Sequence, residues 1–297
     1  MDFIISNQKR LSVKLQRLLM IMVAIIVASM TITACHDDEN DEDGIGDEKP
    51  GQISGFGENK GKISGKAFEL PNGVVFDGDI WGSDWTSALR SAEVNKSGQP
   101  TAHYSLLTDE LTISKKGKVV LPTLDYSTLK DEITTRSVVS DLYKYEMYGS
   151  GNAVLILIPL KNTTSSRIDV EFPAGLIFES TNAKYQHGIL IKKTKVSVPS
   201  GSTYTFILML YCGNANRDMP DTSAKYLKPV VTNSKLLLHL CDLVKNKRIN
   251  AEENNATWEE WGKYMTIATK LQEIVWKVTD YGQVLDKSDL DYIAGLP

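Results

Sequence analysis

The sequence predicts a mainly β protein with an α-helical C-terminal segment, in which an antiparallel β-sandwich is followed by helices. Two observations predict this fold class. Short runs of strand-forming residues, separated by turns that contain glycine or proline, fill much of residues 67–230. After Pro229 the spacing of apolar residues changes from about two to about three and a half residues, which is the helical period. We therefore assign 67–230 to the sandwich and 231–297 to a helical cap.

The first 34 residues have the pattern of a secretory signal peptide. Four basic residues precede an uninterrupted apolar run over 18–28, and small or weakly polar residues follow it up to Ala34. The competing interpretation is a transmembrane helix, because residues 18–34 carry no charge and approach the roughly 17 to 25 residues that a membrane span needs. The threonine-rich end of the run favours cleavage just before Cys35.

The four residues from Ile32 to Cys35 read Ile-Thr-Ala-Cys. This tetrapeptide resembles a bacterial lipobox, although the lipobox prefers leucine where Ile32 stands. The resemblance implies that Cys35 carries acyl chains such as palmitate and anchors the protein in membrane lipid, since each buried methylene contributes about 0.8 kcal/mol. The alternative is a free or disulfide-bonded thiol near an exposed chain end.

Residues 35–66 are expected to form a disordered tether. Eight acidic residues lie between His36 and Glu48 with almost nothing apolar among them, so the segment repels itself and stays solvated. This acidic block after the lipobox resembles the export tether of surface lipoproteins of the Bacteroidetes. The resemblance implies an outer-membrane protein that is exposed at the cell surface, whereas a plain spacer is the simpler interpretation.

The charge of the chain argues against nucleic acid as a partner. The formal net charge is −4, and removing the +3 of the leader and the −8 of the acidic segment leaves +1 from Lys49 onward. Phosphate binding needs a clustered basic face, and no run of lysine or arginine exceeds two residues after the leader.

Strand signals recur through the predicted sandwich. The expected strands are 74–76, 111–114, 118–121, 142–148, 154–160, 167–172, 188–198 and 203–212. The last of these becomes continuously apolar toward its end, as in a central strand that is buried on both faces. Residues 148–152 (Tyr-Gly-Ser-Gly-Asn) predict a hairpin, and 198–202 (Val-Pro-Ser-Gly-Ser) predict another turn.

Residues 170–178, 196–203 and 211–212 resemble the strand-turn-strand pattern of bacterial immunoglobulin-like domains. The resemblance covers about a quarter of the chain and is generic. It implies an immunoglobulin-like sandwich and says nothing about a ligand, because one fold serves many functions.

Three helices are expected in the C-terminal segment. The first starts near Ser234 and carries an apolar stripe, and the second starts with a capping box formed by Thr257 and Glu260. The third is expected to begin at Ser288. Tryptophans on the second helix are interpreted as a packing seam and not as a recognition face.

The sequence offers no catalytic constellation. The histidines and cysteines of the body form no local pattern of nucleophile, base and orienting group. A pair of Cys212 and His187 on adjacent strands lacks an acid or an oxyanion donor beside it. For Cys212 and Cys241 two alternatives stay open, a disulfide that ties the sandwich to the first helix or two buried free thiols.

The stretch from Phe76 to Trp85 is the main candidate for ligand binding. Two tryptophans could stack on sugar rings while neighbouring carboxylates accept hydrogen bonds from hydroxyl groups. The candidate residues are Trp81, Trp85, Asp77, Asp79 and Asp84. A calcium loop is disfavoured, because Trp81 and Ala88 stand where oxygen ligands belong. The competing interpretation has both tryptophans as plugs in the core.

Together these features predict a non-catalytic, lipid-anchored binding module for a glycan, peptide or protein, without a metal or cofactor. A fimbrillin-like structural subunit is the second hypothesis, although a helical C-terminus argues against strand exchange. A secreted hydrolase is the third.

Overall fold

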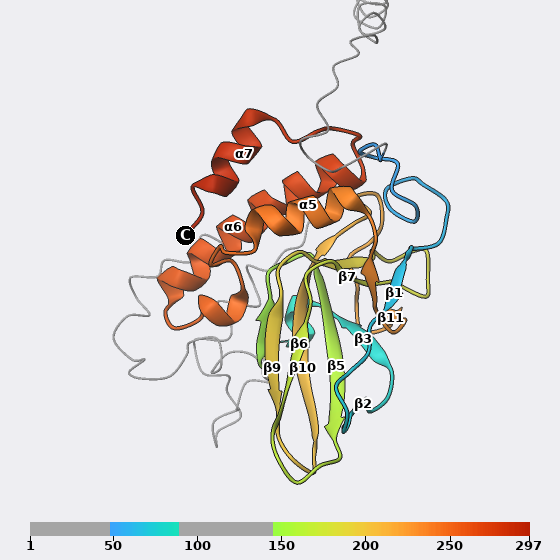
Figure 1. Ribbon diagram of the computed structural model, residues 1–297, viewed down its shortest axis with the longest axis vertical. Coiled ribbons are helices and arrows are strands. Elements are labelled where there is room, and N and C mark those ends of the chain that lie inside the picture. The colour runs from blue at the N-terminus through green and yellow to red at the C-terminus, as the bar shows by residue number, and fades with distance from the viewer. Residues whose placement is uncertain (1–47, 89–144) are drawn as a thin grey trace, which may run out of the picture. The chain divides into compact units, whose positions relative to one another are not determined.

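The computed structural model describes residues 48–88 and 145–297, and Figure 1 shows their arrangement. The strands within these ranges are β1 (Gly65–Ala67), β2 (Val74–Phe76), β3 (Ile80–Ser83), β4 (Met147–Gly149), β5 (Val154–Asn162), β6 (Ile168–Phe172), β7 (Leu176–Phe178), β8 (Gly188–Leu190), β9 (Thr194–Val198), β10 (Thr203–Cys212), β11 (Lys225–Tyr226) and β12 (Val230–Thr232). The helices are α2 (Trp85–Ala88), α5 (Lys235–Val244), the short 3₁₀ helix η1 (Ala251–Glu253), α6 (Trp258–Thr279) and α7 (Lys287–Ala294).

The strands form two sheets that are mainly antiparallel. The larger sheet has the order β1-β12-β7-β8-β10-β5-β3-β11, with β2 added beside β5 and β4 beside β10. The smaller sheet consists of β6 and β9. Only β4 and β10 pair in parallel among the described strands. The prediction of a mainly β, antiparallel protein with C-terminal helices is therefore confirmed at this level.

Strand β10 connects the three hydrophobic clusters of the body. Its residues alternate in direction, so Phe206 and Leu208 enter a first cluster that the smaller sheet also lines. Ile207 and Met209 enter a cluster on the opposite face, under the first half of α6. Tyr211 enters a cluster under α5, the second half of α6 and α7. The prediction that this strand is buried on both faces near its end is confirmed.

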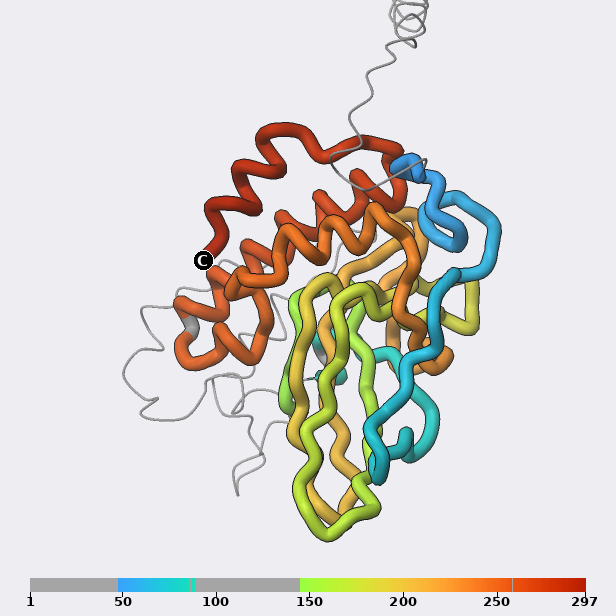
Figure 2. The backbone as a smooth tube through the Cα atoms, viewed as in Figure 1, coloured from blue at the N-terminus to red at the C-terminus, as the bar shows by residue number. Residues whose placement is uncertain are grey.

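The chain before β1 belongs to the folded body, which corrects the predicted extent of the tether. Ile53 and Phe56 are buried in the cluster beneath the helices. Gly57 donates a backbone hydrogen bond to Gly213 at the end of β10 (3.0 Å). Figure 2 shows this N-terminal segment, in blue, beside the C-terminal helices. Ile53 and Phe56 are therefore packed against the helices, and the Gly57 hydrogen bond connects the same segment to the end of β10.

Helix starts follow the predicted signals in two of three cases. Ser234 caps α5 and Thr257 caps α6 through side-chain oxygens that accept backbone N–H groups. The third helix begins earlier than predicted, since Asp286 and Asp289 form its capping box in place of Ser288. An aspartate is as good a cap as a serine, so the pattern allowed both starts.

The hairpin predicted at residues 148–152 is wrong. Strand β10 lies between β4 and β5, and it pairs with both. The connection therefore crosses the end of β10, and Gly151 donates to the carbonyl of Met209 (3.1 Å). A Cβ atom on Gly151 would lie 1.9 Å from the carbonyl carbon of Leu210, so the glycine serves a close backbone crossing and not a tight turn.

The strand predicted over 188–198 is two strands with different partners. β8 pairs with β7 and β10 in the larger sheet, whereas β9 pairs with β6. The turn predicted at 198–202 is confirmed, with Gly201 at φ +67°. The strands predicted at 111–114 and 118–121 lie outside the described residues.

The described residues, 48–88 and 145–297, belong to one compact unit that includes both sheets and the C-terminal helices. In the ranges that the structure describes, no helix combines the length and the apolar character that crossing a bilayer requires. The predicted signal peptide, Cys35 and the acidic block up to Asp47 lie outside these ranges, whereas Glu48, the last acidic residue of the block, lies inside them.

Candidate functional site

Trp81 lies on the larger sheet with its indole partly in solvent. It pairs with Leu157 of β5 on one side and with Lys225 of β11 on the other, so all three side chains share one face. The side chain is 41% exposed, which is high for a tryptophan. Since Ile80 is buried, the alternation of β3 turns Trp81 away from the first cluster and toward solvent.

Neighbouring strands extend this surface. The residues on it are Val75, Trp81, Leu157, Pro159, Lys161 and Thr205, which we call the Trp81 face. Val75 is 48% exposed and Lys161 opposite it is also exposed, whereas Leu157, Pro159 and Thr205 are partly buried. The face combines apolar side chains with Lys161 near its Val75 end, and hydrogen-bonded strands support it.

Lys225 and Asp79 hold the indole from one side. The Lys225 Nζ lies 5.3 Å from the centre of the Trp81 ring system, within the range of a cation–π interaction. The same ammonium pairs with Asp79 at 2.6 Å. Lys225 follows Trp81 by more than 140 residues, and nothing in the sequence pattern pointed to this contact.

Trp85 has the opposite environment. It is only 5% exposed and packs in the cluster with Met147, Leu155 and Tyr264. The two tryptophans therefore do not form one stacking platform, and Trp85 is a core residue.

The remaining acidic candidates support local structure. Asp84 accepts the backbone N–H of Ser87 (2.6 Å) and thereby caps the single turn of α2. Asp77 accepts a hydrogen bond from the Thr203 hydroxyl across the sheet. Of the five candidate residues, Trp81 and Asp79 both contact Lys225. Trp85, Asp77 and Asp84 have structural roles. No group of three or more metal-ligating side chains occurs in the described part of the chain.

Cys212 and Cys241 are both free and buried, so the disulfide alternative is not formed. They belong to different clusters, Cys212 to the first cluster, which the smaller sheet also lines, and Cys241 to that under the helices. Burial raises the pKa of each thiol to about 12. Neither thiol is therefore an available thiolate near neutral pH.

His187 is not a partner for Cys212. Its ring packs edge-on against Phe56 of the helix-side cluster, on the opposite side of the sheet from the Cys212 side chain. Its Nδ1 accepts the backbone N–H of Ser180 (2.9 Å). Burial and the nearby Arg217 lower the pKa of His187 to about 4, so it is neutral under most conditions.

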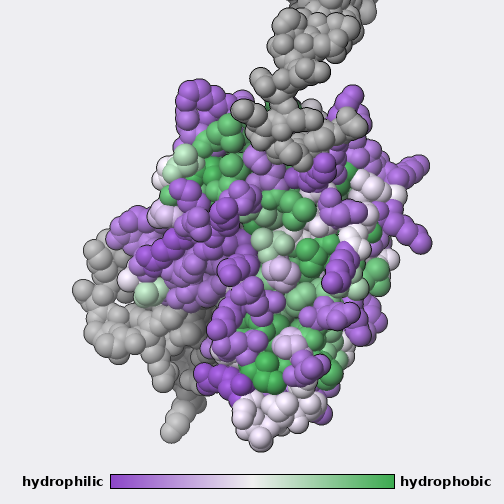
Figure 3. Space-filling view, in the orientation of Figure 1, coloured by the Kyte–Doolittle hydropathy of each residue, from purple (hydrophilic) through white to green (hydrophobic). Residues whose placement is uncertain are grey.

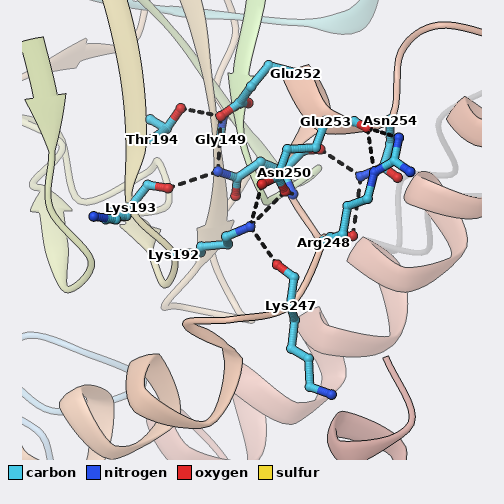
Figure 4. Close-up of polar contacts among 10 residues, drawn as sticks. All are labelled: Gly149, Lys192, Lys193, Thr194, Lys247, Arg248, Asn250, Glu252, Glu253 and Asn254. Carbon is cyan, nitrogen blue, oxygen red and sulfur yellow. Dashed lines mark hydrogen bonds and ion pairs between the residues drawn. The ribbon is translucent and has the colours of Figure 1, made fainter. Parts of the chain in front are cut away.

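A second polar group joins the helical segment to the strands, and Figure 4 shows its contacts. We call it the polar junction; it contains Gly149, Lys192, Thr194, Asn250, Glu252 and Glu253. The Glu252 carboxylate accepts hydrogen bonds from the N–H of Gly149 (2.9 Å), the side chain of Asn250 (3.0 Å) and the Thr194 hydroxyl. Burial raises the pKa of Glu252 above its usual range.

Lys192 completes the polar junction. Its ammonium is almost fully buried and contacts both carboxylate oxygens of Glu253 at 2.7 Å and the carbonyl of Lys247. The donors of Lys192 and the oxygens of Glu252 are thus occupied within the protein. This group fastens η1 to β4 and β9, and it presents no free acid or base to a substrate.

No family model matches the chain, and no curated protein or solved structure is significantly similar to it.

Proposed function

We propose that this protein is a non-catalytic binding module that captures a glycan, peptide or protein on the Trp81 face. The observation that supports the proposal is the exposure of the Trp81 indole on a strand that is paired on both sides. Aromatic side chains of this kind supply a large contact area at a small entropic cost. The opposite charges of Lys225 and Asp79, beside the indole, would orient polar groups of a ligand.

The absence of catalysis is part of the same proposal. Within the described residues the two thiols are buried and protonated, and His187 is buried and neutral. The carboxylate of Glu252 is occupied by three donors. These environments suit structural roles better than nucleophilic or general-base roles.

We further propose that the two sheets form the layers of a sandwich and that Cys35 anchors the protein in the outer membrane, facing outward. The first cluster supports the sandwich, because side chains of β6 and β9 and of the larger sheet line it together. The immunoglobulin-like part of this proposal depends on the sequence pattern of residues 170–212. The anchor depends on the lipobox-like residues 32–35 and the acidic block after them.

The experiment that tests binding applies labelled protein to glycan and peptide arrays, followed by titration of each hit. Truncating an aromatic anchor at an interface costs about 2 kcal/mol or more, which weakens binding about 30-fold. We therefore expect Trp81→Ala to raise the Kd of an array ligand by that order.

Leu238→Ala is the matched control. Leu238 lies on α5 and is 40% exposed, close to the exposure of Trp81, but it is not part of the Trp81 face. Its truncation should leave the Kd unchanged. An unchanged Kd for Trp81→Ala would place the binding site elsewhere on the protein.

A further inference from the structure

The first described residues attach the chain to one end of the helical layer. Glu48 accepts hydrogen bonds from the backbone N–H of Leu236 and the hydroxyl of Ser234, both at 3.0 Å, at the start of α5. Gly51 donates to the carbonyl of Val278 (2.7 Å), the penultimate residue of α6. The connection from the N-terminal part of the chain therefore reaches the body beside the start of α5 and the end of α6.

Exposed apolar residues follow the end of α6, where Gly51 attaches. Tyr281 is 55% exposed, Val284 is 72% exposed and Leu290 is 40% exposed, and all three fall within ten residues between the end of α6 and the middle of α7. We call them the α6–α7 surface. Figure 3 shows hydrophobic residues gathered over this part of the helical layer, at the upper left. Val284 has the largest exposed fraction among the large apolar residues of the described ranges.

The charged residues around the α6–α7 surface are paired with one another. Lys277 pairs with Asp289 (2.6 Å) and Asp286 (3.0 Å), and Lys287 pairs with Asp291 (2.6 Å). These two lysines face three aspartates, so the group has a net charge of −1 and no excess positive charge to attract an anionic partner. The attraction of this surface is therefore hydrophobic.

The tether limits how far this end of the body can lie from an anchor at Cys35. Twelve residues separate Cys35 from Glu48. Such a segment spans at most about 45 Å even when fully extended. At this distance even a weak contact between the body and the lipid surface would be occupied much of the time, because the tether keeps the body close to the bilayer.

We propose that Tyr281, Val284 and Leu290 rest on the lipid surface in which Cys35 is anchored. The inference depends on the proposed lipid anchor and adds an orientation to it. Tyrosine and aliphatic side chains suit the boundary between headgroups and acyl chains, where an amphipathic ring has one wet and one apolar end. Because the contact is hydrophobic, it does not require anionic lipids. This orientation turns β2 and the β9–β10 turn, at the other end of the molecule in Figure 1, away from the bilayer.

The test uses the full-length lipidated protein in phosphatidylcholine vesicles. A bimane fluorophore is attached either to Val284→Cys or to the control Ser200→Cys, an exposed site in the β9–β10 turn. The native thiols Cys212 and Cys241 are buried and Cys35 is acylated, so labelling is selective. Doxyl-labelled lipids should quench the probe at 284 about twofold or more over the probe at 200, since interfacial side chains reach 5–10 Å into the lipid.

Two outcomes would overturn the inference, and they are distinguishable. Equal quenching of both probes in protein that sediments with the vesicles would reject the α6–α7 surface and leave the anchor intact. Failure of both labelled proteins to sediment, with Cys35 unmodified by mass spectrometry, would reject the anchor and the orientation with it. Adding phosphatidylglycerol should leave the quenching ratio unchanged, and a ratio that rises with anionic lipid would contradict a hydrophobic contact.

Discussion

Trp81 and Trp85 lie four residues apart in one polar stretch, yet the fold gives them opposite environments. Trp81 belongs to a strand whose alternate side chains face solvent, whereas Trp85 begins the helical turn α2 and enters the core. The separation of an exposed from a buried tryptophan depends on the change from strand to helix at Asp84. The same change makes the two residues a matched pair for experiments.

Trp85→Ala should destabilise the protein by about 3 to 5 kcal/mol, because it opens a cavity among Met147, Leu155 and Tyr264. Trp81→Ala should cost less than about 1 kcal/mol, since much of its surface is in water already. Urea unfolding of both variants measures the difference. Trp85→Phe is the control, as it keeps most of the side-chain volume and should lie between wild type and Trp85→Ala. Equal losses for the two alanine variants would show that Trp81 is also a packing residue.

At this scale the sequence identified the stretch but not the roles within it. Buried Ile80 and exposed Trp81 alternate as in a strand. A run of only four residues is too short for this alternation to distinguish a strand from a loop in the sequence. The contact of Lys225 with Trp81 and Asp79 joins distant strands, and only the sheet order creates it. The free state of Cys212 and Cys241 likewise follows from their placement in different clusters.

At the scale of elements, long apolar strands and capped helices were predictable and their partners were not. β2 and β10 have the predicted bounds, and Ser234 and Thr257 cap their helices as predicted. The insertion of β10 between β4 and β5 could not be predicted, because glycines at 149 and 151 indicate a hairpin as readily as a crossing. Strand pairing is set by long-range packing, which local patterns do not encode.

The parallel strand β4 is held in part by Glu252, and this contact predicts a dependence of stability on pH. Burial raises the pKa of Glu252 in the folded state, so the folded protein takes up a proton more readily than the unfolded chain. The stabilisation from this protonation is present below the unfolded pKa and is lost as the pH rises through the folded pKa. The unfolding free energy of wild type minus that of Glu252→Gln should therefore be larger at about pH 5 than at about pH 7.

Urea unfolding of both proteins at the two pH values measures this effect. The stability difference between wild type and Glu252→Gln at one pH is compared with the same difference at the other pH. Glu171→Gln is the control, because Glu171 is an exposed residue on β6 paired with Lys193. Its difference from wild type should change little between the two pH values. A difference between wild type and Glu252→Gln that is constant with pH would show that Glu252 does not titrate in this range.

At the scale of the whole molecule, β10 makes the sheets and the helical layer depend on one another. Its side chains enter all three clusters, so unfolding the helices would expose one face of a strand that also stabilises both sheets. The polar junction adds a second connection, since η1 lies between α5 and α6 and bonds to β4 and β9. Cooperative unfolding is the expected consequence of clusters that share residues.

The two buried thiols report on this cooperativity from opposite sides of the sheet. Cys212 lies in the first cluster, which both sheets line, and Cys241 lies in the cluster under the helices. If the body unfolds as one unit, both thiols should become reactive toward a disulfide reagent at the same urea concentration, and the loss of helical circular dichroism should coincide. The measurement uses protein in which Cys35 is blocked or acylated.

Single variants assign the signal to each site. Cys241→Ala leaves Cys212 as the reporter of the sheets, and Cys212→Ala leaves Cys241 as the reporter of the helical layer. Each substitution lowers the overall stability, so each reporter is compared with the circular dichroism of the same variant. We expect the two transitions to coincide in both variants. Exposure of Cys241 at clearly lower urea than the loss of the sheets would mean that the helical layer unfolds alone, because the contacts of α5, α6 and α7 with β10 are then too weak to couple the two parts.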